Sequence, residues 1–260
     1  MKEELKILCQ SKSLELNSSQ NGTFSEKLVN DINFTFNINQ SATEWVKFYK
    51  EDWANGLENG FREDILAKNP MIFFDDYIVL RYFYTWVLVD FFEILPYLPS
   101  QISTILNIGA GIGYLDIILS KLYFSKNLKY YLIEKESSRD STNFDGSTHN
   151  IKKNIKPLFL LKNNFEENKT TNAFFFSPEG FKKNINNITY PINLIISLRS
   201  YCYLYDIDEY YNELSVISDK NTLFIIDVHI DFTEKFKNKF IPLKQIGTYK
   251  TLTRVLARLR

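Results

Sequence analysis

The sequence has few of the residues that build disulfide frameworks and metal centres. Only 2 cysteines and 2 histidines occur among its 260 residues. Cys9 and Cys202 are too few for a disulfide framework or a cysteine-based zinc site, and they suit a reducing compartment. We therefore expect a cytoplasmic protein without a metal site.

A net charge is also lacking, because 31 basic side chains balance 31 acidic ones. This balance argues against a protein whose main role is to hold nucleic acid by neutralising phosphates, so no nucleic-acid partner is expected. The N-terminal residues, MKEELKILCQ, contain no apolar stretch followed by small residues. The sequence therefore predicts no secretory signal.

Long apolar runs are missing as well. The longest, Tyr82–Leu98, contains Asp90 and Glu93 and is interrupted by Pro96. It is short and acidic for a membrane span, so it predicts a buried helix. Hydrophobic residues nevertheless make up 45% of the chain and aromatic residues 16%, which excludes intrinsic disorder of the whole chain.

Two regions of the chain differ in pattern. Residues 1–100 begin with a polar, loop-rich stretch and continue with apolar residues three and four apart, such as Trp45, Phe48 and Tyr49. This spacing is typical of one face of a helix. We predict that residues 1–100 form an N-terminal helical cap and that residues 101–260 form a second domain.

From Ser103 onward, short apolar runs alternate with helical patterns. The runs that predict strands are STILNIG, LKYYLIEKE, PLFLL, PINLIISL and NTLFIIDV. Strands that alternate with helices pair in parallel through right-handed crossovers. Two last runs, FIPLKQIG and KTLTRVLARL, predict an antiparallel hairpin at one edge. The predicted fold is α/β, with a Rossmann-like, open, mostly parallel seven-stranded sheet and an antiparallel edge hairpin.

A glycine-rich turn follows the first predicted strand, in the stretch LNIGAGIGY. A strand that ends in glycines and opens into a helix brings bare backbone and unpaired N–H groups close to a ligand. The glycines at 109, 111 and 113 have the spacing G-x-G-x-G, and Tyr114 stands where dinucleotide-binding turns place a third glycine. No Gly-Lys-Ser/Thr follows, so the turn is not a P-loop. A tight connection that binds no ligand is the alternative interpretation.

An acidic residue, Glu134, ends the second predicted strand, LKYYLIE. A carboxylate at this point can accept hydrogen bonds from both ribose hydroxyls of an adenosine. Together, the glycine turn and Glu134 favour an adenosine-containing cofactor over a purely structural turn.

These segments resemble the class I S-adenosylmethionine-dependent methyltransferases. LNIGAGIGYLDI is similar to the first motif of that family and YYLIEKE to its second-strand acidic motif, and the resemblance covers about residues 103–258. The family usually has an acidic residue where Asn107 stands. The resemblance implies S-adenosyl-L-methionine as cofactor, bound by Asn107, Gly109, Ala110, Gly111, Gly113, Glu134 and Ser197.

A second segment, residues 197–211, resembles sugar O-methyltransferases of bacterial surface-polysaccharide clusters. Ser200 and Tyr201 match that group, whereas Leu204 and Asp206 stand where it commonly has His and Pro. The resemblance implies O-methylation of a sugar or another small hydroxyl acceptor. The expected partner is therefore a small molecule or a glycan, and a homo-oligomer is left open.

Three residues are candidates for the general base, because ligands lie beyond the carboxyl ends of strands in an open α/β sheet. His229 and Asp227 lie at the end of the predicted fifth strand, and Asp206 follows the fourth. A histidine can accept a proton near neutral pH. Asp206, Asp227 and Asp231 would also suit a divalent cation, but capping of the following helices is the favoured role for the acids.

Two other functions stay open. A nicotinamide-dependent oxidoreductase would use a similar turn, although Tyr114 argues against it. A partner protein that keeps the fold but has lost turnover would explain the departures at Asn107 and Leu204.

Overall fold

The computed structural model describes residues 40–47, 50, 76–123, 128–136, 156–202, 205–249 and 251–260. Seven strands form one sheet in the order β3-β2-β1-β4-β5-β7-β6. The predicted Rossmann-like fold is confirmed: β1 to β5 pair in parallel, and β7 pairs antiparallel with both β5 and β6. The strands are β1 (Thr104–Ile108), β2 (Lys129–Ile133), β3 (Ala173–Phe176), β4 (Leu194–Ser197), β5 (Leu223–His229), β6 (Phe240–Tyr249) and β7 (Leu252–Leu259).

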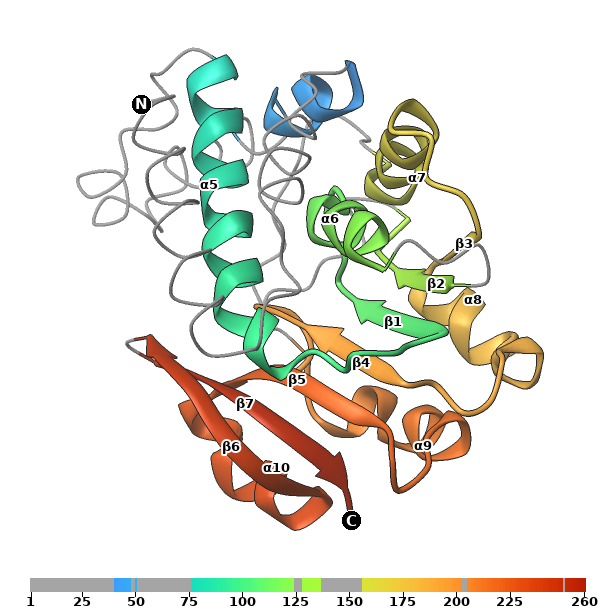
Figure 1. Ribbon diagram of the computed structural model, residues 1–260, viewed down its shortest axis with the longest axis vertical. Helices are drawn as coiled ribbons and strands as arrows, with labels where there is room; N and C mark the ends of the chain where they lie inside the picture. The colour runs from blue at the N-terminus through green and yellow to red at the C-terminus, as the bar shows by residue number, and fades with distance from the viewer. Residues whose placement is uncertain are drawn as a thin grey trace.

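Helices cover both faces of the sheet (Figure 1). On one face lie α5 (Asp76–Ile94), α6 (Tyr114–Leu122) and α7 (Pro157–Glu167), which form one apolar core with the strands. On the other lie α8 (Pro178–Lys183), α9 (Asp208–Ile217) and α10 (Thr233–Lys239), which form the second core. β1 is buried along its whole length, as a strand covered on both faces must be.

One predicted strand is wrong. The run PLFLL lies in α7, and the third strand is the later segment AFFF, β3. The buried residues of α7 recur three and four apart, which is the period of a helix with one buried face, and Pro157 occupies the first turn, where its missing N–H costs nothing. The buried positions of α7 are Pro157, Leu160, Leu161, Asn164 and Phe165.

Of the predicted apolar run Tyr82–Leu98, residues 82–97 fall within α5 and the short 3-10 helix that follows it, Leu95–Tyr97, and Leu98 is extended. No helix in the part of the chain that the structure describes is long and apolar enough to cross a membrane. Of the predicted N-terminal cap, residues 40–47 and α5 are helical. The domain boundary at residue 100 stays a prediction.

A cluster of charged side chains ties α5 to the sheet. We call it the Arg254 cluster, and it contains Asp90, Glu93, Arg199, Asp227 and Arg254. The guanidinium of Arg254 is fully buried and donates to Asp227 at 2.7 and 3.0 Å, to Asp90 at 2.9 Å and to Glu93 at 2.8 Å. Arg199 donates two hydrogen bonds of 2.8 Å to the carboxylate of Asp90. One helix, two strands and the loop after β4 therefore meet at these charges.

Removal of the central cation should destabilise the fold. We expect Arg254→Met to lower the free energy of unfolding by about 3–5 kcal/mol, because it leaves buried carboxylates without their counter-charge. The matched control is Arg258→Met on the same strand, where the arginine is exposed and the change should stay within about 0.5 kcal/mol. Urea denaturation of both variants measures the difference. Equal stabilities would contradict a structural role for the cluster.

Candidate functional site

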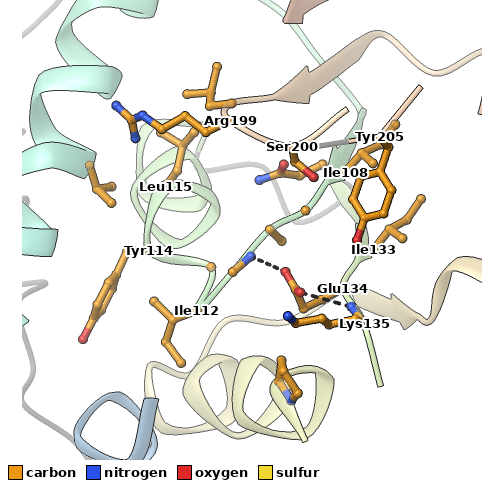
Figure 2. Close-up of a pocket in the computed structure, with 18 of the residues that line it drawn as sticks. Ile108, Ile112, Tyr114, Leu115, Ile133, Glu134, Lys135, Arg199, Ser200 and Tyr205 are labelled. Atoms are coloured by element: carbon orange, nitrogen blue, oxygen red, sulfur yellow. Dashed lines mark hydrogen bonds between the residues drawn. The ribbon is translucent and has the colours of Figure 1, made fainter. Parts of the chain in front are cut away.

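A cavity of about 340 Å³ lies at the carboxyl ends of β1, β2 and β4. Its floor is the turn from Ile108 to Gly113, and one wall is formed by Glu134 and Lys135. The loop after β4 and α5 complete the opposite wall (Figure 2). Cavities of this size and position at the carboxyl ends of parallel strands hold small-molecule ligands and cofactors.

The glycine turn has a backbone that favours glycine at three positions. Gly109, Gly111 and Gly113 have φ values of 75°, 59° and 76°, in the left-handed region. The N–H groups of Gly109 and Ala110 both donate to the carbonyl of Ile133, at 2.9 and 3.1 Å. The turn is therefore bonded to the end of β2.

The three glycines have different neighbours. A Cβ at Gly109 would lie 2.0 Å from Oγ of Ser200, and one at Gly113 would lie 2.4 Å from the ring of Phe165. Among the described residues, a Cβ at Gly111 would meet Trp45 alone, at 3.9 Å. The side chains of the protein itself thus require glycine at 109 and 113, whereas Gly111 presents bare backbone to the cavity.

Glu134 lies against this turn. Its Oε2 accepts a hydrogen bond of 2.7 Å from the N–H of Gly111, and its Oε1 accepts one of 3.1 Å from the N–H of Lys135 (Figure 2). Burial raises the pKa of Glu134, and the two N–H groups oppose that rise. The structure therefore brings together the glycine turn and the carboxylate that the sequence predicted as a cofactor site.

Asn107, on β1, borders the cavity, and its side-chain amide is hydrogen-bonded to a residue that does not border it. Its Nδ2 donates a hydrogen bond of 2.7 Å to Oδ2 of Asp116, in the first turn of α6. Asp116 is fully buried, and burial raises its pKa to about 7, against the effect of the Asn107 hydrogen bond. This pair was not predictable from the sequence, because Asp116 follows the turn as an ordinary first-turn acid.

The loop after β4 supplies the opposite wall. Ser197, predicted to bind the cofactor, is fully buried; its Oγ donates to the carbonyl of Ile108 and accepts from the N–H of Tyr201. It fixes the loop to β1 and does not border the cavity. Arg199 and Ser200 do border it, and Arg199 has a φ of 57°, an unfavourable backbone conformation for a residue with a side chain.

Tyr205 closes the cavity from the same loop. Its hydroxyl end points toward Glu134 (Figure 2), and burial, together with the charge of Glu134, raises its pKa to about 12. The hydroxyl therefore keeps its proton at neutral pH. Sequence reasoning did not single out Arg199 or Tyr205, because nothing in the loop sequence showed which of its side chains turn inward.

The three candidate bases do not border the cavity. Asp227 is fully buried, with both oxygens bonded to Arg254. His229 is mostly buried and its Nδ1 lies 3.2 Å from Oδ2 of Asp231. Asp206 is exposed and bonded to Lys235 and to the N–H of Asp208. A catalytic role for these residues stays a prediction.

Among the residues that the structure describes, no group of three or more His, Cys, Asp or Glu side chains is placed to hold a metal ion. Leu204, where the related segment has His, lies outside the described residues.

Comparison with known proteins found likeness only among solved structures. No protein-family model matches the sequence, and a search of curated proteins found no match. An S-adenosylmethionine-dependent methyltransferase from Aquifex aeolicus has 13% identity and a TM-score of 0.48, over 66% of this chain and 90% of that one. Ribosomal protein L11 methylase from Lactobacillus delbrueckii subsp. bulgaricus has 10% identity and a TM-score of 0.42, over 67% and 76% of the two chains. This level of similarity does not reveal an activity.

Substitution of Gly113 should cost more stability than substitution of Gly111, because the two positions have different neighbours. Gly113→Ala places a Cβ against the buried Phe165 and Leu161, so we expect it to lower the free energy of unfolding by about 2–4 kcal/mol, from overpacking and the left-handed φ together. Gly111→Ala carries only the φ penalty, about 1 kcal/mol. Urea denaturation of the two variants tests this order. A larger loss at Gly111 would contradict it.

Asp116 should make stability depend on pH. Its folded-state pKa lies above the ordinary value of 3.8, so its contribution to stability is fully present below about pH 4 and is lost as the pH rises through about 7. We expect the wild type to lose up to about 4 kcal/mol relative to Asp116→Asn between pH 4 and 8. Urea denaturation of both proteins across this range measures the loss. A constant difference would show that Asp116 has an ordinary pKa.

Proposed function

We propose that the protein is an S-adenosylmethionine-dependent methyltransferase that methylates a hydroxyl of a sugar or another small acceptor. The observation that carries the proposal is the pairing of the Gly111 backbone with the Glu134 carboxylate at the edge of the cavity. Gly111 leaves room for a ligand to lie against the turn, and Glu134 beside it would accept hydrogen bonds from a ribose.

The described residues suit an adenosyl amino acid along the length of the cavity. Glu134 and Tyr205 would face its ribose side, and Asn107 the amino-acid side. Pro178, at the start of α8, and Tyr210 add apolar surface beyond Glu134, where a flat base would lie. The cofactor supplies an activated methyl group.

The acceptor would enter from the side of α5 and the loop after β4. On that side the Asp90–Arg199 pair offers charged groups in a fixed geometry, and Trp45 adds an aromatic surface next to Gly111. Such a mixture of aromatic and hydrogen-bonding groups fits a polyhydroxylated acceptor. The protein would act mainly by alignment of the acceptor oxygen with the methyl group, since proximity alone accounts for much of the rate of such a displacement.

A partner protein that has lost turnover is the second candidate. Two carboxylates border the cavity among the described residues, Asp90 and Glu134, and both are already hydrogen-bonded within the protein. No histidine borders it there. This observation favours a site that binds the cofactor but lacks a general base.

Calorimetric titration with S-adenosylhomocysteine tests the proposal, with NAD as the competing ligand class. We expect S-adenosylhomocysteine to bind and NAD not to bind. Glu134→Ala should weaken S-adenosylhomocysteine binding by about 1–3 kcal/mol, through loss of charge-assisted hydrogen bonds. Glu136→Ala is the matched control, because Glu136 is exposed two residues further on.

Three results would count against this assignment. Equal affinity of the two variants would remove Glu134 from the site, and binding of NAD alone would favour an oxidoreductase. Binding of S-adenosylhomocysteine without methylation of any hydroxyl acceptor in a panel of sugars would favour the partner protein.

A further inference from the structure

A buried acid lies directly behind the cavity wall. Asp116 is fully buried and does not border the cavity itself. One of its oxygens, Oδ2, accepts the hydrogen bond from Asn107, and the other, Oδ1, has no hydrogen-bond partner among the described residues. A buried polar atom without a partner is costly, so such an arrangement calls for a functional reason.

The hydrogen bond decides which end of the Asn107 amide meets a ligand. An amide has one donor end and one acceptor end, and an ionised carboxylate can only accept. Because the nitrogen of Asn107 faces Asp116, its carbonyl oxygen is the end available to the cavity. An acceptor oxygen with a negative charge behind it favours a ligand group that donates hydrogen bonds and carries a positive charge.

We propose that Asp116 is a positioning residue, which acts through Asn107 and makes this end of the cavity select a ligand that bears a primary ammonium group. The inference rests on the proposed function, in which that group is the amino group of the cofactor. A protonated Asp116 would instead be able to donate to the carbonyl oxygen of Asn107. The amide would then present its nitrogen to the cavity and repel the same cation.

Among the described residues, no neighbouring cation contributes to the pKa shift of Asp116. Its neighbour on β1 is the neutral Asn107. Burial and, after it, the Asp116 charge raise the pKa of Tyr130 on β2, so this phenol stays neutral. Other described ionisable groups on the adjoining elements include Tyr114 and Tyr123 at the two ends of α6, and Asp90 and Glu93 on α5, which are bonded to Arg254. On β2, Lys129 and Tyr131 are both bonded to Thr189.

A bound ammonium group should therefore favour the ionised form of Asp116. Because the pKa of Asp116 is about 7, binding of the cation near neutral pH would release a proton from this carboxyl. The pH dependence of affinity then reports on Asp116 itself, which a purely structural role would not produce.

Calorimetric titration of the full chain at pH 6 and pH 8 tests the inference. The ligands are S-adenosylhomocysteine and 5′-methylthioadenosine, which lacks the amino-acid part. For the wild type we expect S-adenosylhomocysteine to bind about tenfold more tightly at pH 8, with proton release detected from titrations in buffers of different ionisation enthalpy. The affinity for 5′-methylthioadenosine should not change with pH.

Two variants locate the effect. Asp116→Asn keeps a hydrogen-bond partner for Asn107 but removes the charge, so it should lose more than about tenfold in S-adenosylhomocysteine affinity at pH 8 together with the proton release. The exchange variant Asn107→Asp/Asp116→Asn keeps one carboxylate and one amide, but the carboxylate is now at position 107 and the amide at position 116. It should recover most of the lost affinity, because its carboxylate then faces the ligand directly.

The outcomes are distinguishable. An S-adenosylhomocysteine affinity that is unchanged in Asp116→Asn and independent of pH would overturn the inference while the proposed function stands. The same pH dependence for 5′-methylthioadenosine would also overturn it, because that ligand has no ammonium group. Failure of the wild type to bind S-adenosylhomocysteine would overturn the proposed function, and the inference with it.

Discussion

The hydrogen bond from Gly111 to Glu134 is the contact on which the candidate site depends. It joins the turn after β1 to the end of β2, beside the two N–H groups that donate to Ile133. Gly111, which donates to Glu134, has its backbone in the left-handed region, and this conformation favours glycine over a larger residue. The same contact holds the Glu134 carboxylate at the edge of the cavity, so the local folding of the turn and the chemistry of the site cannot be separated.

The opposite wall of the cavity depends on buried charge instead of backbone geometry. Arg254 gathers three carboxylates from α5 and β5, and one of them, Asp90, also fixes Arg199 at the cavity. Desolvation makes such a cluster expensive, and apolar side chains of similar volume would serve stability as well or better. Its presence is consistent with a requirement for one orientation of α5, since the directional bonds of Arg254 permit fewer arrangements than an apolar contact would.

The periodicity of the sequence predicted the fold better than the site. Alternating apolar runs identified six of the seven strands, and the failure at PLFLL arose because a short apolar run does not by itself distinguish a strand from a buried helix. The glycine turn and Glu134 were predictable because their spacing along the chain reflects contacts between adjacent strands. Arg199 and Tyr205 were not, because a loop has no period from which the direction of a side chain follows.

Asn107 shows how a departure from a family pattern can mislead when one position is considered alone. In the sequence, the amide at 107 suggests that a negative charge has been lost. In the structure, a carboxylate lies 2.7 Å behind that amide, on the following helix. A charge placed there acts on the cavity through a polarised amide in a medium of low dielectric constant, where its field is weakly screened. Position 107 therefore gives no reason by itself to regard the site as degenerate. For the proposed methyltransferase, turnover would then depend on the acceptor side. The candidate bases His229, Asp227 and Asp206 do not border the cavity, so alignment is the main contribution that the described residues would offer.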